Sequence, residues 1–77
     1  MQLEPVRSRA IAATGYEAGE MRIVFHSGKI YSYPATEEEH AALRNAPSIG
    51  AWFSRYIRPK GGALVVHAHQ SKRKKKP

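Results

Sequence analysis

The sequence contains neither cysteine nor aspartate. Without cysteine there can be no disulfide, no thiol nucleophile and no zinc site built on thiolates. A chain without cysteine also suits a reducing compartment, so we expect a cytoplasmic protein. Serine and histidine occur at scattered positions, with no recognisable set of nucleophile, base and orienting group. We therefore expect that the protein is not an enzyme and that it uses no cofactor.

Long apolar runs are also missing. The first ten residues have no apolar core of signal-peptide length, and no later run approaches the roughly 20 residues of a membrane span. We therefore expect a soluble protein without a membrane partner. A chain of 77 residues allows one small domain, which buries only about 60% of its unfolded surface. Its core is expected to be thin, with little room for a ligand-sized pocket.

Positive charge is abundant but unevenly spread. The net charge is +7, and five of the thirteen basic residues follow one another as Lys72, Arg73, Lys74, Lys75 and Lys76. Such a run is typically a solvated arm, and it adds affinity for any phosphate backbone. The rest of the chain has eight basic residues against six acidic ones. We divide the chain into a folded domain at residues 1–60 and a flexible basic tail at residues 61–77.

The central stretch, residues 21–34, predicts a β-hairpin. Two runs rich in β-branched and aromatic residues flank Ser27 and Gly28, which suit a two-residue turn. With this turn, alternation along the strands defines an apolar face and a mixed face. The apolar face contains Met21, Ile23, Phe25 and Ile30; the mixed face contains Arg22, Val24, His26, Lys29, Tyr31 and Tyr33. A loop longer or shorter by one residue would exchange the faces.

The mixed face allows two interpretations of its tyrosines. Tyr31 and Tyr33 can pack beneath another element, as tyrosine often does on a half-buried sheet. Alternatively, they form a stacking platform for single-stranded nucleic acid, beside the cations Arg22 and Lys29. The sequence leaves both interpretations open.

The remaining segments complete an α+β fold, expected as a three-stranded antiparallel meander followed by two helices packed on one face, with the basic C-terminal tail. Residues 6–16 are the expected first strand. Thr36 and Glu39 form a capping box that starts the first helix, which ends at Asn45 before Pro47. The glutamates at 37–39 suit the positive end of the helix dipole.

Ser48 is the expected N-cap of the second helix. An apolar stripe at helical spacing follows, comprising Ile49, Trp52, Phe53, Tyr56 and Ile57. We expect Trp52, Phe53 and Ile57 to pack on the apolar face of the sheet.

Residues 63–67 have strand propensity, so they either extend a sheet edge or remain poorly ordered. His67 and His69 would project from one side of such a strand as half of a metal site. No cysteine, aspartate or glutamate lies near them in the sequence, so we expect no metal. His26 and His40 are expected to be surface or packing residues and not catalytic ones.

Several short motifs follow one another along the chain: Gly15 with Tyr16, Phe25 with Gly28, Tyr31 with Tyr33, and the later residues Leu43, Ala46, Ser48, Gly50, Phe53, Ile57 and Arg58. Taken in this order, they resemble the KTSC domain family. The resemblance covers about residues 6–58. The family occurs at the C-terminus of some lysyl-tRNA synthetases and as small bacterial and phage proteins, and RNA binding is suggested for it. This chain departs from the family at Ser8 and Arg9, where many members have two serines. It also has Ser54 where an asparagine is common.

These observations predict a small, non-catalytic module that binds nucleic acid, with RNA the favoured ligand. Tyr31 and Tyr33 would stack on bases, and Arg22, Lys29, Arg55 and Arg58 would contact phosphates. The run from Lys72 to Lys76 would extend the electrostatic reach. The alternative is a protein-interaction or self-associating accessory module of a bacterium or phage. Its contact surface would be a sheet edge, residues 63–67 or surplus aromatic residues of the second helix.

Overall fold

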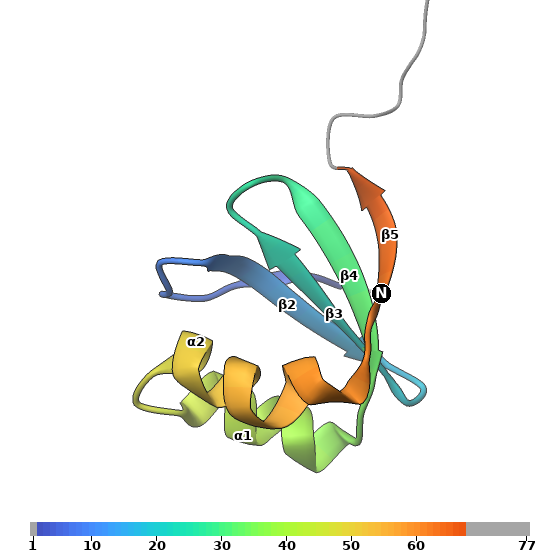
Figure 1. The fold of residues 1–77 in the computed structure, drawn as a ribbon. Helices are drawn as coiled ribbons and strands as arrows, with labels where there is room; N and C mark the ends of the chain where they lie inside the picture. Colours follow the sequence, from blue (N-terminus) through green and yellow to red (C-terminus); the bar gives the residue numbers. More distant parts are fainter. Residues whose placement is uncertain (1, 68–77) are drawn as a thin grey trace, which may run out of the picture.

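The computed structural model describes residues 2–67, which form a five-stranded antiparallel sheet with helices on one face (Figure 1). The strands follow one another across the sheet in sequence order: β1 (Glu4–Pro5), β2 (Ile11–Glu17), β3 (Glu20–Phe25), β4 (Lys29–Pro34) and β5 (Ala63–His67). The helices are α1 (Glu37–Asn45) and α2 (Ile49–Trp52). Helix α2 continues directly as a π-helical segment, η1 (Phe53–Ile57), and a 3₁₀ turn, η2 (Arg58–Lys60).

The α+β class and the two helices are confirmed, but the expected number of three strands is wrong. The short strand β1 pairs with β2 at one edge of the sheet, and β5 pairs with β4 at the other. The expected first strand also begins too early, because residues 6–10 form a connection between β1 and β2. Residues 63–67 thus extend a sheet edge, one of the two outcomes that their strand propensity left open. Strand β1 has only two residues and is joined by long-range pairing, for which a local sequence pattern gives little signal.

The central hairpin forms, but its predicted loop length is wrong. Strands β3 and β4 leave three residues between them, and the amide of Gly28 donates to the carbonyl of Phe25 at 2.9 Å. Gly28 has a φ of 99°, as expected for the left-handed residue that closes a three-residue loop. Ile23 therefore faces Tyr31, and Val24 faces Ile30. Compared with the predicted register, Tyr31 and Tyr33 therefore lie on the face of the sheet that the helices cover, and Ile30 lies on the opposite face.

Both helix starts are confirmed. The amide of Glu39 donates to Thr36 Oγ1 at 3.1 Å, and the amide of Thr36 donates to Glu39 Oε1 at 2.8 Å, which completes the capping box. Ser48 caps α2 by accepting from the amide of Ala51 at 3.3 Å. These local hydrogen bonds fix the starts of the two helices, which lie next to each other beneath the sheet, with the chain turning back between them (Figure 1).

The core lies between the helices and the covered face of the sheet. Its buried residues are Ile11, Met21, Ile23, Tyr33, Leu43, Phe53 and Ile57. The ring of Phe53 contacts Phe25 and Tyr33 edge-on, with centroids 5.7 and 5.3 Å away. The predicted packing of Phe53 and Ile57 on the sheet is thus confirmed.

Of the other two aromatic members of the stripe, Trp52 packs against the core from its margin as expected, whereas Tyr56 does not reach the core. Trp52 is half-buried, and Tyr56 is 50% exposed. The amide of Arg58 bonds to the carbonyl of Phe53, five residues earlier, so this turn is wider than an α-helical one. The wider turn keeps Ile57 below Phe53 but rotates Tyr56 away from the sheet.

Candidate functional site

The expected tyrosine platform does not form. Tyr33 is only 5% exposed and Tyr31 is half-buried. The centroids of their rings are 6.3 Å apart, on the face of the sheet that the helices cover. Burial raises the pKa of Tyr33, an effect that the positive charge of Arg58 partly opposes. Of the two interpretations of Tyr31 and Tyr33, packing beneath another element therefore holds, and the solvent-facing stacking platform is wrong, because the longer hairpin loop reverses the faces of β4.

The predicted cations are spread over the molecule. Arg22 lies on the uncovered sheet face, where its Nε donates to Glu20 Oε2 at 2.9 Å. The same oxygen accepts from Ser32 Oγ at 2.7 Å, and the hydrogen bonds from Ser32 and Arg22 lower the pKa of Glu20. Lys29 is exposed at the start of β4. Arg22 is thus already paired, and Lys29 lies on a strand, whereas Arg55 and Arg58 lie on the helical segment.

Arg55 and Arg58 lie on the helical segment that follows α2, and both are exposed. The Arg55 guanidinium is 5.7 Å from the centroid of the Tyr56 ring. The five basic residues at 72–76 lie outside the described residues.

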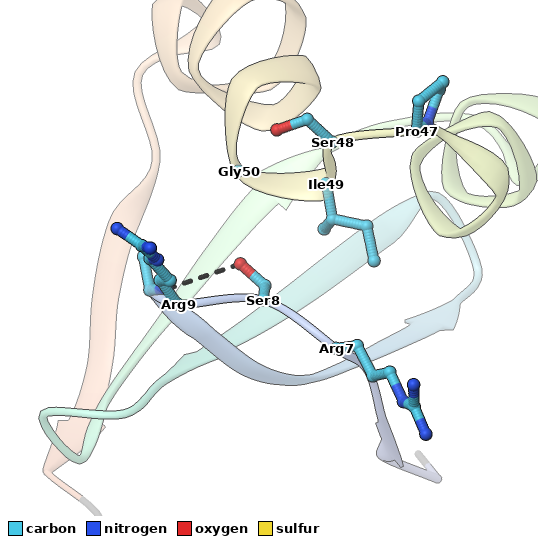
Figure 2. A pocket seen from close by; sticks show the side chains of 8 residues that line it. Arg7, Ser8, Arg9, Pro47, Ser48, Ile49 and Gly50 are labelled. Atoms are coloured by element: carbon cyan, nitrogen blue, oxygen red, sulfur yellow. Dashed lines mark hydrogen bonds between the residues drawn. The ribbon is translucent and has the colours of Figure 1, made fainter.

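The structure instead brings together residues of the connection after β1 and the start of α2. They surround a cavity of about 340 Å³ lined by Arg7, Ser8, Arg9, Ala10, Pro47, Ser48, Ile49 and Gly50. Figure 2 shows Ser8 pointing toward the first turn of α2, with the two arginine side chains extending away from each other on either side. Both arginines are exposed, so their side chains can change rotamer toward a bound group.

Both serine hydroxyl groups of this cavity accept hydrogen bonds from backbone amides. Ser8 Oγ accepts from the amides of Ala10 and Ile11, each at 3.3 Å, and Ser48 Oγ accepts from the amide of Ala51. Each hydroxyl proton is therefore left to donate to another acceptor. No carboxylate lines the cavity. With two arginine and two serine residues among its lining residues, the cavity is suited to an anion once the arginine side chains turn toward it.

The connection that carries Ser8 is held at several points. The amide of Val6 donates to the carbonyl of Ala12 at 3.1 Å, and the amide of His26 donates to the carbonyl of Ala10 at 3.0 Å. His26 Nε2 lies 2.9 Å from the carbonyl oxygen of Ser8, which can only accept, so this ring nitrogen is the donor. These bonds fix the position of Ser8 opposite α2 from both β2 and the β3–β4 hairpin.

A second, mainly apolar groove lies on the other side of the same turn. It has a volume of about 300 Å³ and is lined by Ala46, Pro47, Ser48, Ala51, Trp52, Arg55 and Tyr56. The rings of Trp52 and Tyr56 have centroids 4.9 Å apart and planes tilted by 46°. Pro47 and Ser48 line both hollows, so the anion cavity and the aromatic groove adjoin.

Comparison with known families identifies the domain that carries both features. The family model for the KTSC domain matches residues 7–60. The chain belongs to the KTSC domain family. The matched segment runs from the connection before β2 to the end of η2, so it contains both hollows, whereas β1 and β5 lie outside it. No curated protein matches the chain.

A third hollow, of about 240 Å³, lies beside α1 and is lined in part by His40. The fully buried Thr14 hydroxyl is 3.0 Å from His40 Nε2, and the rings of Tyr16 and His40 stack at 5.9 Å. Burial lowers the pKa of His40, and the charge of Arg44 lowers it further. Thr14 and His40 satisfy each other, so this arrangement serves packing.

Two kinds of feature are absent from residues 2–67. No group of three or more histidine, cysteine, aspartate or glutamate side chains is placed to hold a metal ion there. In the same residues, no helix is both long and apolar enough to span the membrane.

Sequence reasoning missed the anion cavity because its parts are distant in the chain. Arg7 and Ser8 precede Ser48 by about forty residues, and residues 6–10 were expected within a strand. One signal was available: Arg9 stands where many KTSC domains have a serine, which places a second cation beside Ser8. The aromatic groove was missed because Trp52 and Tyr56 fitted a core stripe so well.

Proposed function

We propose that this KTSC domain is a non-catalytic nucleic-acid-binding module that holds a backbone phosphate in the cavity between Ser8 and Ser48. The observation that carries the proposal is the lining of this cavity, which contains hydrogen-bond donors and positive charge but no carboxylate. Arginine and hydroxyl side chains are frequent phosphate contacts in nucleic-acid complexes. RNA is our favoured ligand, as the resemblance to the family suggested.

The distribution of charge supports this position of the site. Before residue 72 the chain has eight basic residues. Three of them form ion pairs, namely Arg22 with Glu20, Arg44 with Glu4 and Lys60 with Glu39. The five without a carboxylate partner among the described residues are Arg7, Arg9, Lys29, Arg55 and Arg58. Arg7 and Arg9 line the anion cavity and Arg55 lines the adjoining groove, so unpaired charge gathers on this side.

The test is a double variant, Arg7→Ala with Arg9→Ala, in the full chain. Binding to a labelled single-stranded RNA is measured by fluorescence anisotropy at low salt. Loss of two charged contacts should weaken binding by about 1–2 kcal/mol, which is roughly five- to thirtyfold. The matched control is Arg44→Gln with Lys60→Gln, which removes the same charge from residues already engaged in exposed ion pairs.

Equal weakening by the two double variants would mean that only net charge matters, and the cavity would not be the site. Absence of RNA and DNA binding by the full chain at low salt would reject nucleic-acid binding altogether.

One observation favours a second candidate, a protein-interaction module. Strand β5 forms an edge of the sheet, and Leu64 and Val65 on it are 48% and 41% exposed. An exposed apolar edge strand can pair with an extended segment of another protein. A partner that is captured from a lysate after nuclease treatment and at high salt, and is lost on Leu64→Lys substitution, would support this candidate.

A further inference from the structure

We infer that the groove formed by Trp52, Arg55 and Tyr56 takes an unpaired base, and that the domain therefore selects single-stranded over duplex nucleic acid. The inference rests on the proposed function, since the base belongs to the strand whose phosphate occupies the neighbouring cavity. It concerns a surface other than the tyrosine pair of β4, which is buried.

The first support is the surplus of aromatic surface on the helical segment. Phe53 and Ile57 already provide its buried contacts with the sheet. Tyr56 has no place in the core cluster and is 50% exposed, and Trp52 is only partly covered. The two rings meet at 46° and, with the side chains of Ala46, Pro47 and Ala51, bound an apolar hollow. Such a surface can receive a flat aromatic group by stacking.

The second support is the charge around the groove. The Arg55 guanidinium lies 5.7 Å from the Tyr56 centroid, and no acidic side chain lines the groove. Arginine beside aromatic rings suits a base joined to a phosphate. A groove with tryptophan and tyrosine can also bind a proline-rich peptide. The adjoining anion cavity favours a nucleic acid over such a peptide, because a neutral peptide would leave the arginine and serine donors of the cavity without an acceptor.

The third support is the shared turn. Pro47 and Ser48 line both hollows, so one ligand can occupy the cavity on one side and the groove on the other. A nucleotide strand has phosphate and base as neighbouring groups. In a duplex the base faces are stacked within the helix, whereas in a single strand they can be splayed onto side chains. Simultaneous use of both hollows therefore requires an unpaired nucleotide.

The experiment uses Trp52 as its probe, because it is the sole tryptophan in the chain. The full chain is titrated with a short single-stranded RNA, with the same strand annealed to its complement, and with the same strand lacking its bases. Intrinsic fluorescence reports stacking, and anisotropy of an end label reports affinity. We expect the single strand to quench Trp52 and to bind most tightly, and the abasic strand to bind more weakly without quenching.

The variant is Tyr56→Ala, which removes a half-exposed ring outside the core. Loss of one stacked base should weaken single-strand binding by about five- to 150-fold and leave duplex binding nearly unchanged. Tyr56→Phe keeps the ring and should retain the affinity. Leu64→Ala is the matched control, because it removes a side chain of similar exposure from β5.

The results separate the inference from the proposed function. If Tyr56→Ala binds normally while Arg7→Ala with Arg9→Ala binds weakly, the base site is overturned and the phosphate site stands. The reverse pattern rejects the phosphate cavity and overturns the joint use of the two hollows, although the groove would still bind a base. If no oligonucleotide binds, both are rejected. A shift of Trp52 fluorescence by a proline-rich peptide, with none by RNA or DNA, would overturn the inference in favour of a protein ligand.

Discussion

At the scale of single residues, Gly62 shows how closely the chain approaches the buried Tyr33. A Cβ at position 62 would lie within 2.6 Å of three atoms of the Tyr33 ring. Tyr33 is buried against Phe53, so its ring has little freedom to move aside. We expect Gly62→Ala to lower the free energy of unfolding by about 1–3 kcal/mol through overpacking. Urea denaturation followed by circular dichroism measures this change.

Gly50 provides the control for that substitution. A Cβ there would meet Ser8 Oγ at 3.6 Å, an ordinary contact. Alanine is also favoured over glycine within a helix by roughly 1 kcal/mol. Gly50→Ala should therefore leave stability unchanged or raise it. If the two substitutions change the free energy of unfolding equally, the close contact between residue 62 and the Tyr33 ring is not the cause of the loss of stability.

His40 gives a prediction about pH. Because burial lowers its pKa from the usual 6.5, the unfolded chain takes up a proton on His40 at a higher pH than the folded domain does. Stability should therefore fall as the pH drops below about 6.5, until the folded histidine is also protonated. The hydrogen-bonded carboxyl groups of Glu20 and Glu39, whose pKa values are lowered, lose their contributions only as the pH falls below about 4.5.

The measurement is the urea midpoint between pH 7.5 and 5. His40→Gln should lower stability at neutral pH by losing the packing with Tyr16, and it should flatten the dependence between pH 6.5 and 5. If the His40→Gln variant keeps the same dependence of the urea midpoint on pH as the unsubstituted protein, another titratable group causes that dependence.

At the scale of elements, the helical segment after Ser48 contains both a core aromatic residue, Phe53, and an exposed one, Tyr56. Phe53 is 4% exposed and contacts two core rings, whereas Tyr56, one turn later, is 50% exposed. Phe53→Ala should lower the free energy of unfolding by about 3–5 kcal/mol, enough to unfold so small a domain. Tyr56→Ala should change it by no more than about 0.5 kcal/mol. Thermal denaturation of the two variants checks the contrast.

Similar losses from the two substitutions would place Tyr56 in the core, as an unbroken α-helical stripe predicts. The comparison thus tests the π-helical turn as well as the stability of the domain.

The elements also show what the sequence could predict. The capping box of Thr36 and the cap of Ser48 were predicted correctly because each depends on residues within one turn of the helix. The hairpin was predicted but its register was not, since Ser27 and Gly28 suit loops of two or three residues equally well. One residue of error was enough to place Tyr31 and Tyr33 on the wrong face.

The candidate site was harder to predict than the fold. Arg55 was predicted as a phosphate contact and lies at the groove, but Arg22 is paired with Glu20. The anion cavity joins Ser8 to Ser48, and no local pattern indicates that residues so far apart will meet. The departure of Arg9 from the family pattern marks that position in the sequence, but its place opposite Ser48 is known only once the connection between β1 and β2 has been placed.

At the scale of the whole molecule, the KTSC segment is extended at both ends. The match at residues 7–60 ends two residues before β5 begins, and β1 precedes it. Strand β5 pairs along β4, where Leu64 faces Tyr31. Additions outside the family segment therefore complete both edges of the sheet, and the basic run follows β5 in the sequence.

The basic run leads to the last prediction, which concerns salt. Removing residues 68–77 deletes five cations from the chain. Each phosphate contact on a single strand contributes about 0.7 to the slope of log affinity against log salt concentration, so full engagement of the run accounts for about 3.5. We expect the 1–67 chain to bind single-stranded RNA more weakly, with a slope smaller by up to this amount, and to keep its preference for single strands.

Titrations across several salt concentrations measure the slope for the full chain and the 1–67 chain, each with and without the Arg7→Ala and Arg9→Ala substitutions. The comparison separates the contribution of the basic run from that of the arginines in the folded domain. If the 1–67 chain loses binding at every salt concentration, the run alone carries the affinity. If its slope is unchanged, the phosphate contacts belong to the folded domain.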